Sequence, residues 1–469
     1  MSKNRELAKN TMILTIGKIC TQFVSFLLLP LYTSILNTND YGIVDLFATY
    51  VSLLMPIVCF QLDQGLFRFM LDKRENQREI KKLFSSLFII MMAQIFAFLI
   101  IYGFASFFIA SEYKIYLLFN VILAVISSFF MQFARGLGKM MTYAISSFIT
   151  ATSTVVFNVL FLVIFKWGAD GMFRATLMGL MINVVYLFVS LKIYKYFDYS
   201  LFNINMVKDV LKYSIPLIPN QISGWVLTAS DRTLVSLFLG VAFNGLYAIA
   251  YKFSGLVATF YGFFNMAWVE TVSLHFGEDD KEEYLSKTIQ TVLGMFSCIC
   301  LGIIAIMPFV FPIMVNAKFK KAYYQIPILL IAVVFQILVG LLSAIYLAEK
   351  KSMIIAKTTI VGAIINFIVD LILISKIGLY AASLSTLISY AIVALYRAYD
   401  IKKIVLIRWN KKFIISLIGA YLVVLIAYYS QILVIEIAAL IFAIVYAIII
   451  NREFIIGIYN EGMMILKKR

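Results

Sequence analysis

The sequence predicts an all-α polytopic membrane protein with about fourteen transmembrane helices, arranged as two pseudo-symmetric six-helix lobes plus two C-terminal helices. Composition is the first observation behind this prediction, because 63% of the 469 residues are hydrophobic and 14% are charged. Soluble domains are about 45–50% apolar and about 25% charged. In addition, apolar stretches long enough to cross a bilayer recur along the chain, and the second half repeats spacings of the first.

A membrane-spanning helix needs ~20 apolar residues, because each residue adds about 1.5 Å and the hydrocarbon layer is about 30 Å thick. By this measure we expect helices over residues 12–36, 41–65, 83–110, 115–133, 143–165, 172–191, 213–239, 244–268, 289–315, 324–347, 354–374, 379–396, 413–429 and 432–450. The longest connections between them hold about twenty residues. They leave no room for an extramembrane catalytic domain.

Basic residues give the chain a net charge of +16. Most of them fall in the loops that face the cytoplasm if the N-terminus is cytoplasmic, as the positive-inside rule requires. A cluster after the ninth predicted helix, Lys318, Lys320 and Lys321, is the exception. We therefore expect cytoplasmic N- and C-termini and basic loops beside anionic lipid head groups, with no nucleic-acid partner.

Residue counts exclude several kinds of chemistry. The chain has one histidine, His275, so it has neither a histidine acid–base pair nor a His-based metal site. Its four cysteines lie inside apolar segments and predict no disulfide framework. We expect no metal site and no cofactor. The basic N-terminus leads into an apolar run that is too long for a signal peptide and has no cleavage site, which indicates a retained signal anchor.

The two halves of the chain share an ordered motif. Lys166-x-Gly168-x-x-Gly171 in the first half corresponds to Lys376-x-Gly378-x-x-Ala381 in the second half. Each copy contains six predicted helices in the same order, which is typical of transporters that place the substrate site between two related halves. We expect an N-terminal lobe over residues 1–200, a C-terminal lobe over residues 201–403, and helices 13 and 14 with a basic cytoplasmic tail over residues 404–469.

The first predicted helix carries polar residues along one face. Thr15, Lys18, Gln22 and Ser25 follow one another at steps of three or four residues, the spacing of one helical face. A lysine inside a membrane helix is costly unless it faces water, protein or a counter-ion. We therefore interpret this stripe as one wall of a polar cavity, with Pro30 bending the outer end of the helix.

The repeat places a similar stripe on the seventh predicted helix. Gln221, Thr228 and Arg232 share one face there, and Lys252 lies at a position of the eighth helix whose counterpart in the first half is polar. We predict a cationic cavity lined by Lys18, Arg232 and Lys252. Lys18 and Arg232 would meet an anionic substrate at two depths in the membrane.

Intramembrane acids have two interpretations. Asp45, Asp231 and Asp370 either couple transport to Na⁺ or H⁺ or form structural salt bridges. Near predicted helix ends, Asp63 is expected to be solvated or salt-bridged at the interface. Glu436 is expected to extend its carboxylate to the outer surface.

Short motifs at both ends of the repeat point to one family. Pro30-Leu31-Tyr32-Thr33 ends the first predicted helix, Tyr41-Gly42 opens the second, and Lys376-x-Gly378 is followed by Ala381 and Thr386. In these motifs the chain resembles bacterial polysaccharide repeat-unit flippases of the O-antigen and capsule type. These belong to the multidrug/oligosaccharidyl-lipid/polysaccharide exporter (MOP) superfamily. The likeness covers nearly the whole chain.

The resemblance implies a transporter and not an enzyme. Such a protein moves an undecaprenyl-pyrophosphate-linked oligosaccharide repeat unit across the bacterial plasma membrane by alternating access, for capsule, O-antigen, exopolysaccharide or teichoic-type polymers. The partners it implies are the lipid-linked oligosaccharide, membrane lipids, a polysaccharide polymerase and glycosyltransferases. Lys and Arg suit pyrophosphate because they combine charge with hydrogen-bond donors. A multidrug cation antiporter of the same superfamily and a membrane polysaccharide polymerase are the alternatives.

Overall fold

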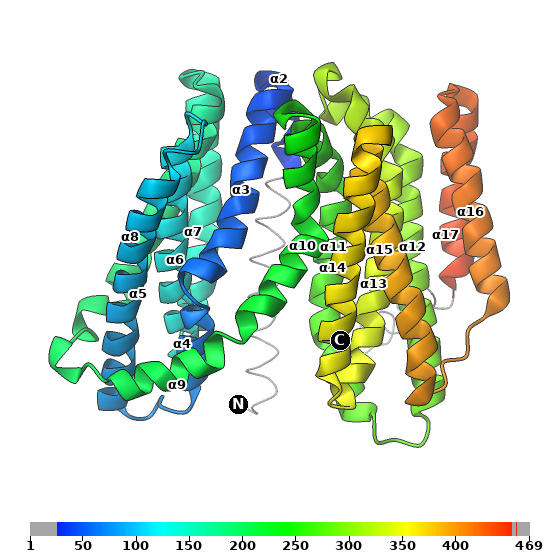
Figure 1. Cartoon of the computed structure of the whole chain (residues 1–469). Helices are drawn as coiled ribbons and strands as arrows, with labels where there is room; N and C mark the ends of the chain where they lie inside the picture. Colours follow the sequence, from blue (N-terminus) through cyan, green and yellow to red (C-terminus); the bar gives the residue numbers. More distant parts are fainter. Residues whose placement is uncertain (1–25, 453–455, 457–469) are drawn as a thin grey trace, which may run out of the picture. The chain divides into compact units, whose positions relative to one another are not determined.

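The structure is a computed structural model that describes residues 26–452 and residue 456. Within these residues the regular elements are all helices, which confirms the predicted all-α membrane fold (Figure 1). Twelve helical segments of this described part are long and apolar enough to cross a membrane. They match the predicted spans except for residues 12–36, mostly outside the described part, and 213–239, where α10 (Leu217–Phe238) lies.

The chain divides into two compact units. The boundary between them in the sequence lies between Trp225 and Val226, inside α10. In unit 1, a tightly packed aromatic core forms where α5 meets α6, with the rings of Phe84 and Phe133 4.5 Å apart. Besides the start of α10, unit 1 contains α2 (Leu29–Ile35), α3 (Thr38–Val58), α4 (Leu62–Leu71), α5 (Gln77–Ala105), α6 (Lys114–Gly136), α7 (Met140–Val159), α8 (Gly168–Leu191) and α9 (Ile204–Ser214).

The second predicted span, residues 41–65, is not one helix. The α3 helix begins at Thr38, where the Asn37 side chain accepts a hydrogen bond from the Asp40 N–H at 2.7 Å, and it ends at Val58. Phe60 and Gln61 then adopt left-handed φ angles of 48° and 56° before α4 begins. Two such residues in succession end a right-handed helix. The prediction of a continuous span was therefore wrong at its C-terminal end.

The connection predicted between the sixth and seventh spans contains a helix that the sequence analysis missed. The α9 helix runs crosswise to α5 in Figure 1. It buries Val207 and Val210 and exposes Lys208 and Lys212. An apolar face opposite lysines is typical of a helix that lies along a membrane surface.

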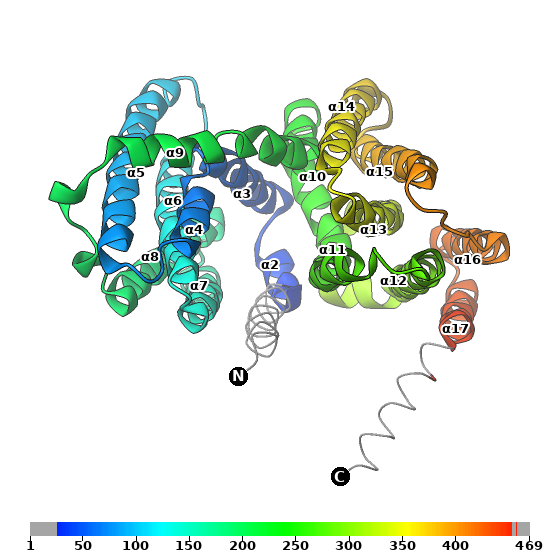
Figure 2. The same ribbon diagram turned by 90° about the horizontal axis from the view of Figure 1, so that it is seen from below.

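In unit 2, α13 lies between α11 and α15 when the helices are viewed end on (Figure 2). Besides the rest of α10, unit 2 contains α11 (Val241–His275), α12 (Lys281–Met314), the 3-10 helix Ala317–Gln325, α13 (Ile326–Ala348), α14 (Ser352–Ile377), α15 (Tyr380–Asp400), α16 (Lys411–Ser430) and α17 (Leu433–Ile450).

The repeated Lys-x-Gly motif forms a glycine-dependent turn in each unit. Gly168, at the start of α8, has φ of +56°, and Gly378, between α14 and α15, has φ of +59°. Residues with a Cβ rarely adopt this conformation. The sequence repeat therefore marks turns with the same backbone requirement.

The α16 helix is hydrogen-bonded to the rest of unit 2. The hydroxyl of Tyr421 donates to the carbonyl of Ser297 on α12 at 2.8 Å. At the other end of α16, the Tyr428 hydroxyl donates to the Tyr323 carbonyl at 2.7 Å. These hydrogen bonds attach α16 to unit 2, and α17 packs against α12 and α16.

Candidate functional site

A buried carboxylate on α10 is the centre of a polar cluster in unit 2. Asp231 is 1% exposed, and its Oδ2 accepts hydrogen bonds from the hydroxyls of Tyr247 on α11 (2.8 Å) and Thr386 on α15 (2.6 Å). A buried charge keeps its position only when such donors surround it. Three helices therefore contribute to the environment of this one side chain.

The fourth helix of the cluster is α14, through the amide of Asn366. In the orientation that satisfies both ends of the amide, its nitrogen donates to Asp231 Oδ1 at 3.0 Å and its oxygen accepts from the Thr386 N–H at 3.2 Å. Asn366 is fully buried. Both carboxylate oxygens of Asp231 therefore have donors.

The second buried carboxylate is on α14, one turn beyond Asn366. Asp370 is fully buried, and neither of its oxygens has a hydrogen-bond partner among the described residues. Asp231 and Asp370 are both buried acids, and Asn366, one turn from Asp370, contacts Asp231. Two buried like charges are strongly unfavourable unless a proton or a cation neutralises one of them.

The chemistry of the cluster suits a hydrogen ion or a small hard cation. Carboxylate, amide and hydroxyl oxygens are the ligands that hard cations prefer, and Asp231, Asp370, Asn366 and Thr386 supply them. In the described part of the chain, no group of three or more His, Cys, Asp or Glu could hold a metal ion. A site with two carboxylates and neutral oxygens fits a proton or a monovalent cation.

Arg232 places a cation beside this cluster. It is 8% exposed, its Nη1 donates to the Thr228 carbonyl at 3.2 Å, and its Cζ lies 4.4 Å from the ring centre of Tyr251. Its charge also acts on Asp231, the preceding residue. Thr228, Tyr251 and Thr386 line a small cavity of about 10 Å³ nearby, which is about the space of one water molecule.

The structure brings together only some of the predicted site residues. Asp231, Arg232, Thr228 and Asp370 lie in unit 2 around or beside the polar cluster, and Lys252 is half-buried on α11 next to Tyr251. Four predicted residues of the first helix lie outside the described residues: the cationic Lys18 and the polar Thr15, Gln22 and Ser25.

Two other predicted residues belong to unit 1. Asp45 is half-buried on α3, and its carbonyl accepts a hydrogen bond from the Thr49 hydroxyl at 2.8 Å. Gln221 is exposed on the first part of α10. Asp45 is therefore outside the unit that contains the paired carboxylates.

Asp63 differs from its expected place at the membrane interface. It is 2% exposed at the start of α4 and accepts hydrogen bonds from the Ser128 hydroxyl (2.7 Å) and the Gln64 amide (3.1 Å). These neutral donors replace the expected solvent or cation. The break between α3 and α4 directs α4 against α6, which explains the burial.

Sequence reasoning missed two residues of the cluster, Tyr247 and Thr386. Thr386 had a signal, since it follows the Lys376-x-Gly378 motif, but nothing in the sequence connects it with Asp231. Tyr247 is one of 28 tyrosines and had no signal. Asn366 lies one turn before Asp370, a spacing that points to a shared helix face.

Comparisons with known proteins agree with this architecture. The family described as polysaccharide biosynthesis protein matches residues 7–273. An uncharacterized membrane protein of Methanocaldococcus jannaschii is 22% identical over 476 residues, which cover 95% of this chain and 92% of that protein.

Solved structures share the fold. The lipid II flippase MurJ in an inward closed conformation has a TM-score of 0.70 and 15% identity, covering 95% of this chain and 100% of its own. An inward-facing multidrug resistance MATE transporter of the MOP superfamily has a TM-score of 0.69 and 14% identity, covering 81% and 95%. A MOP superfamily transporter from Pyrococcus furiosus has a TM-score of 0.55 and 13% identity, covering 84% and 96%.

Proposed function

The chain belongs to the polysaccharide biosynthesis protein family, and from this premise we propose that it flips an undecaprenyl-pyrophosphate-linked oligosaccharide repeat unit across the bacterial plasma membrane by alternating access. The family match over residues 7–273 is the observation that carries the proposal. The fold supports it, because the lipid II flippase MurJ, which has the same fold, is named for the transport of a lipid-linked molecule. Transport rather than catalysis is the proposed activity.

Cationic side chains are the proposed contacts of the pyrophosphate. Lys18, Arg232 and Lys252 supply charge and hydrogen-bond donors, which phosphate oxygens accept. The burial of Arg232 supports this role, because a buried cation attracts an anion more strongly than an exposed one does. The proposed arrangement has both termini in the cytoplasm and the basic loops at anionic lipid. A polymerase and glycosyltransferases are the proposed partners.

The Asp231–Asp370 cluster is the proposed coupling site. A sodium ion or a proton bound there would neutralise one of the two buried carboxylates. Occupancy of the site by the ion would then depend on the ion gradient across the membrane. This gradient would be the energy source of the transport cycle. Asp45, in unit 1, is not part of this site.

Reconstitution tests the proposed transport. A fluorescent undecaprenyl-pyrophosphate oligosaccharide is placed in proteoliposomes, and its accessibility to an impermeant quencher is followed with time. We expect the wild-type protein to accelerate transbilayer movement, and Lys18→Ala and Arg232→Ala to slow it at least about tenfold, because each loses a charge-assisted hydrogen bond. Lys412→Ala, an exposed lysine at the start of α16, is the matched control. Movement no faster than in protein-free vesicles would reject the proposal.

A multidrug cation antiporter is the second candidate function. Two buried carboxylates in unit 2 favour it, since an acidic site attracts an organic cation. Growth of cells that express the protein, challenged with cationic dyes, separates the two candidates. Resistance that depends on Asp231 and Asp370, together with no effect on surface polysaccharide, would favour the antiporter.

A further inference from the structure

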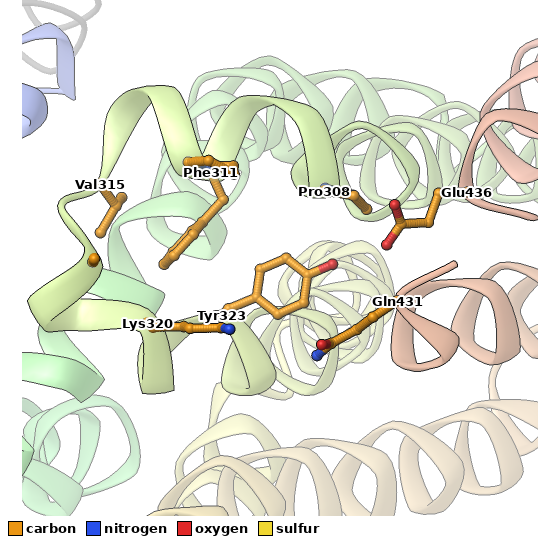
Figure 3. Close-up of a pocket in the computed structure, with 9 residues that line it drawn as sticks. Pro308, Phe311, Val315, Lys320, Tyr323, Gln431 and Glu436 are labelled. Carbon is orange, nitrogen blue, oxygen red and sulfur yellow. The ribbon is translucent and has the colours of Figure 1, made fainter. Parts of the chain in front are cut away.

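A cavity of about 370 Å³ lies in unit 2 where α12 ends. Its walls are the last turns of α12, the 3-10 helix that follows it, the connection between α16 and α17, and the first turn of α17 (Figure 3). Its volume lies within the ~300–1,000 Å³ of typical small-molecule sites. Asp231, Asp370 and their partners do not line it, so this cavity is separate from the polar cluster.

The cavity contains one basic and one acidic side chain. Lys320 and Glu436 both line it, yet neither forms an ion pair within the described part of the chain. Figure 3 shows the Lys320 ammonium, the Gln431 amide and the Glu436 carboxylate around the ring of Tyr323. The two charges cancel, so the cavity favours neither a cation nor an anion as a whole. Glu436, which is expected to extend its carboxylate to the outer surface, is half-buried at this cavity.

Acceptors and donors both reach the cavity. Gln431 uses its amide nitrogen to donate to the Tyr324 hydroxyl at 2.7 Å, which leaves its carbonyl oxygen as an acceptor. Pro312 has no N–H, so the carbonyl of Pro308, one turn earlier in α12, loses its helical donor. Lys320 supplies donors. A ligand with several hydroxyl groups needs this combination, because each hydroxyl both donates and accepts.

The aromatic wall of the cavity is rigid. Tyr323 is 8% exposed, and its ring stacks on that of Tyr428 with centres 4.1 Å apart and planes 9° apart. Phe311 meets the Tyr323 ring edge-on at 5.4 Å. Fixed aromatic rings provide a flat apolar surface at little entropic cost on binding.

From these features we propose that the cavity lined by Lys320, Tyr323, Gln431 and Glu436 binds one sugar ring of the transported glycan. A sugar ring is uncharged, has C–H faces that pack on aromatic rings, and has hydroxyl groups that pair with the acidic, basic and amide side chains. This inference rests on the proposed function, because that function supplies the glycan. An acyl chain is the less suitable occupant, since it offers no hydrogen bond to Lys320, to Glu436 or to the carbonyl oxygen of Gln431.

Saturation-transfer NMR on the full chain in lipid nanodiscs tests the inference, with glucose, galactose and N-acetylglucosamine as probes. We expect at least one of these sugars to show transfer to its ring protons. Glu436→Gln combined with Gln431→Ala should weaken that binding by roughly tenfold, because two hydrogen bonds are lost, one of them to a charged group. Lys320→Ala should weaken it in the same way.

Lys318→Ala is the matched control, because Lys318 lies on the same 3-10 helix and does not line the cavity. All variants must elute as the wild type does in size exclusion and melt close to it, which shows that they fold. If a single variant fails this test, Glu436→Gln alone and Lys320→Met replace it. Transfer that is absent for all three sugars, or equal in wild type and cavity variants, would overturn the inference.

The transport assay separates this inference from the function on which it rests. Wild-type protein that flips the lipid-linked substrate but binds none of the sugars rejects the sugar cavity alone. Wild-type protein that flips nothing rejects the proposed function. In the cavity variants, which keep Asp231 and Asp370, the substrate concentration at half-maximal rate should rise. Their maximal rate should change little. A merely structural role would not produce this pattern.

Discussion

Asp370 places two carboxylate oxygens inside unit 2 without a hydrogen-bond donor among the described residues. Its neighbour in the cluster, Asp231, has donors at both oxygens. The difference assigns distinct tasks to the two acids. Asp231 is held in place by the protein, and Asp370 is the group whose charge needs an external partner.

Thermal unfolding measures this need directly. We expect the melting temperature of the wild-type protein in detergent to rise with sodium concentration, or with falling pH if the partner is a proton. A ligand that binds only the folded state at ~100 times its Kd stabilises by about 2.7 kcal/mol. Asp370→Asn removes the charge and should abolish the response. Asp45→Asn, in unit 1, should keep it. An unchanged response in Asp370→Asn would contradict the assignment.

Arg397 on α15 is a buried cation held by neutral acceptors. It is 1% exposed, and its guanidinium donates to the hydroxyl of Thr358 (Nε, 2.9 Å) and to the carbonyls of Val339 and Ile355 (both 3.2 Å). The Thr358 hydroxyl donates its own hydrogen to the carbonyl of Ile354. It therefore acts toward Arg397 only as an acceptor. The planar guanidinium therefore joins α13, α14 and α15 at one point.

Substitutions at Arg397 should separate charge from geometry. Arg397→Lys keeps a buried charge but loses the forked donors, and we expect a loss of about 2–3 kcal/mol. Arg397→Met removes the charge together with its desolvation penalty, so its loss should be smaller. Chemical denaturation of the purified protein measures both, with the exposed Lys412→Met as control. A larger loss in Arg397→Met than in Arg397→Lys would show that the charge itself stabilises the unit.

At the scale of single elements, hydropathy predicted most helices because the bilayer sets both their length and their composition. The positions of α6 and α8 agree with residues 115–133 and 172–191 to within a few residues. The break before α4 and the crosswise α9 were missed. Left-handed residues other than glycine leave no mark in an apolar sequence, and α9 is too short and too polar to register as a span.

Substitutions at Phe60 test the break between α3 and α4. Phe60 has φ of +48° and is 41% exposed, so its side chain packs little while its backbone is strained. Phe60→Gly should hold or raise stability by up to about 1 kcal/mol, and the β-branched Phe60→Ile should lower it by about 1–2 kcal/mol.

The control for this test lies in the regular part of α3. Ser52 is exposed there, and Ser52→Gly should destabilise by about 0.5–1 kcal/mol, the ordinary effect of glycine in a helix. Thermal melts of the three variants provide the comparison. If Phe60→Gly destabilises as much as Ser52→Gly, residues 59–61 are helical.

At the scale of the whole molecule, the sequence identified the costly side chains but not their partners. Asp231 and Asp370 stand out in any apolar helix, and the repeat pointed to Arg232. Which residues surround them depends on how α10, α11, α14 and α15 pack, and no periodicity encodes that packing. Tyr247 and Thr386 joined the site only through tertiary structure.

The division into two units makes a prediction about energy coupling. Both carboxylates of the cluster belong to unit 2, whereas Asp45 belongs to unit 1. In proteoliposomes with an imposed sodium or proton gradient, wild-type flipping should accelerate at least severalfold over flipping without a gradient. Asp370→Asn should flip at the gradient-free rate under both conditions, because it lacks the carboxylate that needs a cation. Asp45→Asn should respond as the wild type does. If Asp45→Asn loses the response to the gradient and Asp370→Asn keeps it, the coupling site lies in unit 1. If both variants keep the response, the buried pair has a purely structural role.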